Sequence, residues 1–232
     1  YSDEIIDALQ KDFGNRDPKS SFLTEIASTI GVLEHAIKNV DKWTKDEKRP
    51  SNVDRPFFIR MLMGFLGSKS YIKYQPLGTV GVISPWNFPV NLILAPLGGI
   101  FAAGNRAMIK PSELTPATSE VTKKMFEAYF DKSEAAVFTG DAEVGAAFSA
   151  LPFDHLLFTG GTQIGKKVMK AASDNLVPVT LELGGKSPVI VDEDANLSEV
   201  AKKVMRGKTM NAGQICLAPD YLMLPKGKSQ EF

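Results

Sequence analysis

The 232-residue sequence predicts an α/β protein in which helices cover both faces of a parallel sheet, preceded by N-terminal helices. From Gly78 onward, short β-rich runs alternate with helical segments. These segments are long enough to form the crossover helices that parallel strands require. Before Gly78, apolar residues recur at the spacing of amphipathic helices. We therefore expect a Rossmann-like sheet, a type that binds ligands at the carboxyl ends of its strands.

Two helices are expected at the start of the chain. Ser2 is the expected N-cap of the first helix, Gly14 ends it, and Pro18 opens the second helix. The second helix carries apolar residues at helical spacing along one face. These residues are Phe22, Ile26, Ile30, Leu33, Ile37 and Val40.

Between these helices and Gly78, the sequence predicts a loop and a strand. Residues 45–56 are charged and include two prolines, so we expect a surface loop there. Residues 70–75 show the alternation of a strand. His35, in the second helix, is expected to be a surface residue and not a ligand.

The remainder of the chain is expected to supply the sheet and one further unit. Strands are expected at residues 79–83, 107–109, 135–139, 155–159 and 179–183. The connecting helices are expected at residues 90–103, 115–129, 143–151 and 162–173. A strand, a helix and a strand then follow at residues 187–191, 197–210 and 221–224.

The composition is that of an ordinary globular protein and excludes several function classes. The 27 basic residues balance the 27 acidic ones, so the charge predicts neither a nucleic-acid partner nor a membrane-surface partner. The longest apolar run, residues 92–103, is shorter than the roughly 20 residues that a membrane span needs. A single cysteine indicates a reducing compartment, and we expect a cytoplasmic protein.

Cys216 is the only cysteine in the chain, and two interpretations of it stand. It is either a small buried apolar residue or a chemically used thiol. Gly213 and Gln214 precede it and Pro219 follows it. This neighbourhood predicts a tight turn that holds one side chain at a fixed angle.

Two further side chains have the chemistry that a nucleophilic thiol would need. Asn87 lies in a loop stiffened by prolines, between Trp86 and Phe88, where its amide could face a developing oxyanion. A structural turn is the alternative for Asn87. Glu182 lies between leucines at a strand end, and an apolar setting would raise its pKa toward that of a general base. A structural salt bridge is the alternative for Glu182.

Two segments could hold a nucleotide. The glycine turn from Gly160 to Gly165 joins a strand to a helix start, where backbone N–H groups and the helix dipole favour a phosphate. The glycines could equally serve turn geometry alone. Lys110 and Glu113 follow another strand, where they could bind ribose hydroxyls or form an exposed ion pair of little energetic value.

Five sequence motifs that occur in a fixed order are far more specific for a protein family than any one of them alone. They resemble, in order and spacing, the motifs of the NAD(P)-dependent aldehyde dehydrogenase superfamily, and they cover nearly the whole chain. The motifs are Pro85–Pro89, Lys110–Glu113, Phe158–Gly165, Leu181–Lys186 and Gly213–Cys216. The residues around the cysteine look most like the class of fatty, benzylic and coniferyl aldehyde enzymes. The resemblance implies the aldehyde dehydrogenase fold, in truncated form.

The resemblance also implies roles. Cys216 would be the nucleophile, Asn87 would stabilise the oxyanion together with the Cys216 backbone N–H, and Glu182 would activate the hydrolytic water. Lys110 and Glu113 would hold the adenosine ribose of NAD, with NADP as the alternative, and no metal is needed. The other implied cofactor contacts are Ile83, Pro85, Trp86, Ser112, Gly160, Gly161, Gly165, Leu183 and Gly184.

Three parts of the chain are expected by this resemblance. Residues 1–77 would form the N-terminal helices and the start of an oligomerisation strand region. Residues 78–185 would form the NAD(P)-binding domain, and residues 186–232 the first part of the catalytic domain. The family continues well beyond the cysteine, so the chain is expected to be a fragment of an enzyme that is a homodimer at full length. Membrane association is left undetermined.

This chain departs from the family at Gly161, where members commonly have Ser or Asn. A side-chain contact to phosphate would then be missing. Three rival functions stand beside aldehyde oxidation. The chain could bind a dinucleotide without turnover, serve a structural purpose, or belong to an enzyme that passes the acyl group to coenzyme A. The retained Glu182 favours hydrolysis over acyl transfer.

Overall fold

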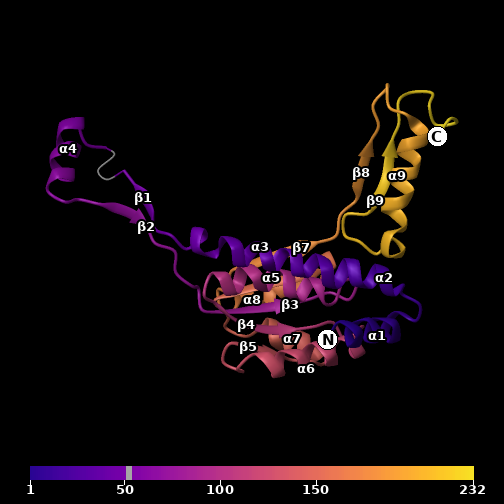
Figure 1. The fold of residues 1–232 in the computed structure, drawn as a ribbon, viewed down its shortest axis with the longest axis horizontal. Coiled ribbons are helices and arrows are strands. Elements are labelled where there is room, and N and C mark those ends of the chain that lie inside the picture. Colours follow the sequence, from indigo (N-terminus) through magenta and orange to yellow (C-terminus); the bar gives the residue numbers. More distant parts are fainter. Residues whose placement is uncertain (51–53) are drawn as a thin grey trace.

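The computed structural model describes residues 1–50 and 54–232. Figure 1 shows a central α/β body with an extension on either side. An arm that contains β1, α4 and β2 leaves the body on one side, and the unit of β8, α9 and β9 leaves it on the other. Part of the loop expected at residues 45–56 lies outside the described residues.

The central sheet confirms the expected fold class. Its five strands are all parallel and lie in the order β5-β4-β3-β6-β7. The strands are β3 (Thr79–Ile83), β4 (Arg106–Lys110), β5 (Ala135–Val137), β6 (His155–Gly160) and β7 (Val179–Leu183). The chain runs outward from β3 to β4 and β5, and then returns to the other side of β3 for β6 and β7. Ligands of such sheets bind where the order reverses, beyond the carboxyl ends of β3 and β6.

Helices cover both faces of this sheet, as expected. They are α5 (Asn91–Ala102), α6 (Pro116–Tyr129), α7 (Ala142–Ser149) and α8 (Thr162–Ser173). Because strand side chains alternate, Val82 and Ile109 pack in one core cluster with α5 and α6. Leu156 and Phe158 pack in a second cluster with α7 and α8.

The N-terminal segment forms α1 (Ser2–Phe13), α2 (Pro18–Ser21), a π-helical segment (Phe22–Ala27) and α3 (Ser28–Trp43). Gly14 ends α1 in the left-handed region, with φ of 81°, and Pro18 opens α2, both as predicted. The expected N-cap at Ser2 is wrong. The carbonyl of Tyr1 accepts the first helical hydrogen bond from Ile5 N, so Ser2 already lies in the first turn.

The expected apolar face of this segment is only partly correct. Three of its residues are exposed: Phe22, Ile30 and Ile37. The residues that are buried instead are Glu25, Thr29 and Ala36. The π-helical turn is wider than an α-turn, so it shifts the face that the following helix presents to the body.

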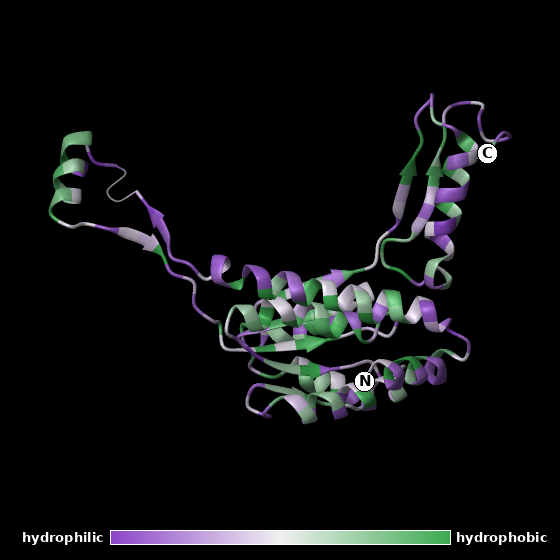
Figure 2. Ribbon diagram, viewed as in Figure 1, coloured by the Kyte–Doolittle hydropathy of each residue, from purple (hydrophilic) through white to green (hydrophobic). Residues whose placement is uncertain are grey.

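The arm differs most from the sequence prediction. β1 (Glu47–Arg49) lies within the expected loop and pairs antiparallel with β2 (Ser70–Ile72), which is shorter than the expected strand. Helix α4 (Phe57–Phe65) was not predicted, and it contains no buried residue. Figure 2 shows α4 as a hydrophobic helix at the end of the arm.

The last unit confirms the expected order of strand, helix and strand. β8 (Ser187–Ile190) pairs parallel with β9 (Pro219–Met223), and α9 (Leu197–Thr209) connects them, followed by a short 3-10 turn (Met210–Gly213). The division of the chain at residues 77/78 and 185/186 stays a prediction. Within the described residues, no helix has both the length and the apolarity to cross a membrane.

Candidate active site

Two neighbouring cavities open at the carboxyl edge of the central sheet. The first, of about 480 Å³, lies among the ends of β3, β4 and β6. The second, of about 730 Å³, reaches from the end of β7 to the turn before Cys216. Pro85, Trp86, Gly160 and Gly161 line both cavities, so a ligand that fills the first can extend into the second.

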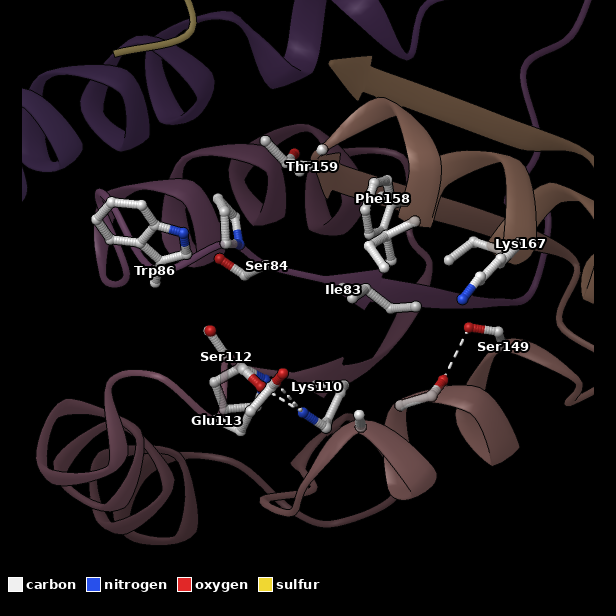
Figure 3. Close-up of a pocket in the computed structure, with 18 of the residues that line it drawn as sticks. Ile83, Ser84, Trp86, Lys110, Ser112, Glu113, Ser149, Phe158, Thr159 and Lys167 are labelled. Atoms are coloured by element: carbon white, nitrogen blue, oxygen red, sulfur yellow. Dashed lines mark hydrogen bonds and ion pairs between the residues drawn. The ribbon is translucent and has the colours of Figure 1, made fainter. Parts of the chain in front are cut away.

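Lys110 and Glu113 lie together in the first cavity (Figure 3). Lys110 Nζ donates a hydrogen bond of 2.8 Å to the Pro111 carbonyl and lies 3.4 Å from Glu113 Oε2. The Lys110 side chain is only 3% exposed, whereas that of Glu113 is 44% exposed. The pair is therefore not a solvated loop ion pair: a buried ammonium group holds a carboxylate whose remaining oxygen can accept hydrogen bonds. Ile83 and Ser112 line the same cavity.

In the glycine turn between β6 and α8, Gly160 is closely packed and Gly161 faces open space. A Cβ at Gly160 would lie 2.6 Å from the Phe158 ring, so packing excludes a side chain there. A Cβ at Gly161 would meet nothing within 4 Å. Gly161 is the N-cap of α8, and in the described part of the chain no side chain caps this helix, so its first N–H groups are left for another acceptor. This turn is suited to an anionic ligand.

Gly165 is the one predicted cofactor contact that lines neither of these two cavities. It is buried in the first turns of α8, and a Cβ there would lie 2.9 Å from Leu183 Cδ2. Its observed role is the close packing of α8 on β7.

Asn87, Glu182 and Cys216 line the second cavity together, although they are far apart in the sequence. The three predicted chemical groups thus converge at one place. Leu183 and Gly184 line this cavity as well.

The loop that carries Asn87 is hydrogen bonded directly to the turn that precedes Cys216. Asn87 Nδ2 donates to the Gln214 carbonyl at 2.8 Å, and Asn211 Nδ2 donates to the Asn87 carbonyl at 3.0 Å. An amide nitrogen carries two hydrogens, so Asn87 retains a second one for an acceptor in the cavity.

The turn before Cys216 has an unusual backbone. Asn211, Ala212 and Gly213 all have positive φ angles, of 48°, 55° and 80°. Such strain is costly for residues other than glycine and is common at functional sites. Cys216 follows this turn and is exposed, so the interpretation as a buried apolar residue is wrong.

Glu182 does not have the apolar setting expected from its neighbours in sequence. β7 is an edge strand, and Leu181 and Leu183 pack against the second core cluster on one side of it. Side chains alternate along a strand, so Glu182 projects to the opposite side and is exposed. Among the described residues it forms no ion pair, and the salt-bridge alternative therefore finds no support.

Sequence reasoning missed Arg16 and Glu25, which lie directly behind the Asn87 loop. Arg16 Nη1 donates to the Asn87 carbonyl at 3.3 Å, and Arg16 Nη2 lies 2.9 Å from Glu25 Oε1. One signal was available: Glu25 is a lone carboxylate between Phe22 and Ile26 of the expected apolar face. In the described part of the chain, no cluster of three or more His, Cys, Asp or Glu residues could hold a metal ion.

Comparison with known sequences gives a consistent result. A model of the aldehyde dehydrogenase family matches residues 1–232. The chain is 56% identical over 229 residues to a probable coniferyl aldehyde dehydrogenase of Caulobacter vibrioides, covering 99% of this chain and 46% of that protein. It is 53% identical to a coniferyl aldehyde dehydrogenase of a Pseudomonas species, covering 98% of this chain and 45% of that protein.

Solved structures have the same fold. The substrate-bound state of Staphylococcus aureus AldH superposes with a TM-score of 0.89 at 42% identity, over 100% of this chain and 48% of that one. PnpE in complex with nicotinamide adenine dinucleotide gives a TM-score of 0.84 at 29% identity, over 100% of this chain and 45% of that one. The chain thus spans about half the length of the proteins that it matches.

Proposed function

Because the chain belongs to the aldehyde dehydrogenase family, we propose that the protein containing it oxidises an aldehyde to a carboxylic acid with NAD(P)⁺. The observation that carries this proposal is the convergence of Asn87, Glu182 and Cys216 on one cavity. That cavity adjoins a second one whose lining suits a dinucleotide.

Cys216 supplies the nucleophile in the proposed reaction. Its thiolate attacks the aldehyde carbon and forms a thiohemiacetal. The free hydrogen of the Asn87 amide and the Cys216 backbone N–H stabilise the oxyanion that develops. The nicotinamide cofactor, when bound, would supply the acceptor for the hydride that leaves this carbon, and Cys216 would then carry a thioester.

Glu182 completes the reaction by taking a proton from a water molecule. The resulting hydroxide attacks the thioester carbon, the carbon–sulfur bond breaks, and the carboxylic acid leaves. The thiolate of Cys216 is thereby restored. The exposure of Glu182 at the edge of β7 is consistent with access to water.

The dinucleotide is proposed to bind along the first cavity. Glu113 would accept hydrogen bonds from ribose hydroxyls while buried Lys110 holds it in place. The open N-terminus of α8 at Gly161 would face the pyrophosphate. Pro85 and Trp86, shared by both cavities, lie where the nicotinamide end would pass toward Cys216. A carboxylate at the ribose favours NAD, with NADP as the alternative cofactor.

The proposed substrate is a coniferyl-type aromatic aldehyde, supported by the two relatives named for that activity. We further propose a homodimer at full length and a cytoplasmic location. A second candidate is a dinucleotide-binding module without turnover, because the first cavity is built within this chain, which spans only half of its relatives.

The test is the Cys216→Ala variant of the full-length protein, assayed for NADH formation from coniferyl aldehyde. We expect activity to fall to the background of the assay, because the proposed thioester forms on this thiol. Lys124→Met, which alters an exposed ion pair on α6, serves as the control and should leave activity unchanged. Turnover retained by Cys216→Ala would refute the proposed mechanism.

A further inference from the structure

Arg16 and Glu25 form a buried ion pair next to the Asn87 loop. Arg16 lies in the connection between α1 and α2, and Glu25 lies in the π-helical segment. Their side chains are 6% and 0% exposed, and Nη2 and Oε1 are 2.9 Å apart.

Arg16 contacts the loop at Asn87 and at the residue that follows it. Its Nη1 donates to the Asn87 carbonyl at 3.3 Å, the same oxygen that accepts from Asn211 Nδ2. Its guanidinium carbon lies 5.4 Å from the centre of the Phe88 ring and 4.8 Å from that of Phe13. Both distances are within the range of a cation–π interaction.

Glu25 holds the far end of the same loop. Its Oε2 accepts hydrogen bonds from Val90 N at 3.1 Å and from Asn91 N at 2.8 Å, at the start of α5. A carboxylate at a helix N-terminus satisfies N–H groups that have no acceptor within the helix. Arg16 and Glu25 thus hold the second half of the loop, from Asn87 to the start of α5, and they are held to each other.

Stability alone does not explain this pair. Burial raises the pKa of Glu25, against the opposing effects of its hydrogen bonds from Asn91 and Val90 and of Arg16. Burial likewise lowers the pKa of Arg16, against the opposing effect of Glu25. Buried ion pairs are often weaker sources of stability than apolar residues. What the pair does supply is a fixed position for the loop.

We propose that Arg16 and Glu25 are positioning residues that hold the Asn87 amide in place at the second cavity. This inference rests on the proposed role of Asn87 in stabilising the oxyanion. It goes beyond that role because it assigns the orientation of the amide to the N-terminal helices, which do not line the cavity.

The first test is Arg16→Lys in the full-length enzyme. A lysine keeps the positive charge beside Glu25 but cannot donate to Glu25 and the Asn87 carbonyl with two separate nitrogens. We expect kcat for aldehyde oxidation to fall about 10- to 100-fold, because small displacements of catalytic groups are costly. The KM for NAD⁺ should stay within about twofold, because the proposed ribose and pyrophosphate contacts, at Glu113 and Gly161, lie outside this loop.

Lys124→Met is the matched control for the N-terminal helices. Lys124 Nζ lies 3.1 Å from Glu4 Oε2, so this pair also joins the first helix to the body, but it does not touch the Asn87 loop. Unchanged kcat in this control and reduced kcat in Arg16→Lys support the inference. An equal reduction of kcat in Arg16→Lys and Lys124→Met would overturn the inference.

A double-mutant cycle with Asn87→Ala separates positioning from general structure. If Arg16 acts through the Asn87 amide, Arg16→Lys should lower the residual rate of Asn87→Ala by less than about twofold. If Arg16→Lys lowers the rate of the Asn87→Ala variant by the same factor as it lowers the rate of the unmodified enzyme, the inference is overturned. If Arg16→Lys does not fold, the double variant Arg16→Met, Glu25→Gln takes its place, because it removes both charges together and keeps an acceptor for the α5 N–H groups.

The alkylation rate of Cys216 tests the same inference without any aldehyde. The Asn87 loop is hydrogen bonded to Asn211 and Gln214 of the cysteine turn, so displacement of the loop should change the exposure of the thiol. We expect iodoacetamide to label the Cys216 peptide at a rate altered about threefold or more in Arg16→Lys and unaltered in Lys124→Met. An unaltered rate in Arg16→Lys would contradict the inference. Absence of aldehyde turnover in the unmodified enzyme would instead refute the proposed function.

Discussion

The candidate site depends on three side chains, and the structure constrains their positions to different degrees. Asn87 is hydrogen bonded through both its side chain and its carbonyl. Cys216 follows a turn in which Asn211, Ala212 and Gly213 have left-handed backbone angles. Glu182 is exposed on an edge strand, so it is the least constrained of the three.

Glu182→Gln should separate acylation from hydrolysis. The amide cannot act as a base, whereas Cys216 and Asn87 remain in place to form the thioester. Rapid mixing of the full-length variant with aldehyde and NAD⁺ should give a burst of about one NADH per active site, followed by turnover reduced at least about 100-fold. Steady turnover at the unmodified rate would exclude Glu182 as the base.

These residues could be found from the sequence only in part. The glycine and proline around Cys216 predicted a turn. Glycine allows backbone angles that other residues avoid, and proline fixes its own φ angle. The apolar neighbours of Glu182 led to the wrong prediction that this residue has an apolar setting. Adjacent side chains of a strand face opposite sides, so the neighbours do not surround it. Glu25 could have been suspected as a lone carboxylate on an apolar face, but its pairing with Arg16 could not be predicted, because tertiary packing brings the two side chains together.

Among the helices and strands, the doubly wound sheet was predictable, whereas of the arm only the strand β2 was predicted. Strands β3 and β7 and helix α8 have the predicted bounds, because alternating β-rich runs and glycine or proline boundaries recur there. Helix α4 follows a charged, proline-containing stretch that favours a loop. The π-helical segment is set by backbone hydrogen bonding that residue spacing does not encode.

Helices α3 and α5 approach each other closely at Gly98. A Cβ at Gly98 would lie 3.2 Å from Leu33 Cδ2 and 3.5 Å from Ala36 Cβ. Gly98→Leu should therefore lower the free energy of unfolding by about 1–3 kcal/mol, because extra carbon atoms overpack the contact.

Gly99→Leu is the adjacent control for this prediction. A Cβ at Gly99 would meet nothing within 4 Å, and the residue is exposed. Leucine also favours helix over glycine by roughly 0.8 kcal/mol, so this variant should be as stable as the unmodified protein or more stable. Urea unfolding measures both variants, and equal stability of Gly98→Leu and Gly99→Leu would show that the contact tolerates a side chain.

For the molecule as a whole, the central consequence is that two cavities share one wall. The lining common to both comes from the loop after β3 and the turn after β6, where the strand order reverses. A cofactor held by Lys110 and Glu113 would therefore reach the cavity of Cys216 without any change in the sheet. The proposed cofactor and the proposed nucleophile would then lie side by side.

Cofactor binding can be measured without catalysis. A ligand that binds only the folded state stabilises it, by about 2.7 kcal/mol at a concentration of 100 times its Kd. NAD⁺ should therefore raise the melting temperature of the protein, and Glu113→Ala should reduce that shift. An identical shift in Glu113→Ala would remove Glu113 from the cofactor site.

The most direct test of the proposed mechanism is mass spectrometry of the Glu182→Gln variant of the full-length protein, quenched with acid after mixing with coniferyl aldehyde and NAD⁺. We predict that the peptide containing Cys216 gains the mass of the acyl group, and that this gain requires NAD⁺. An unmodified Cys216 peptide during an NADH burst would contradict the thioester mechanism.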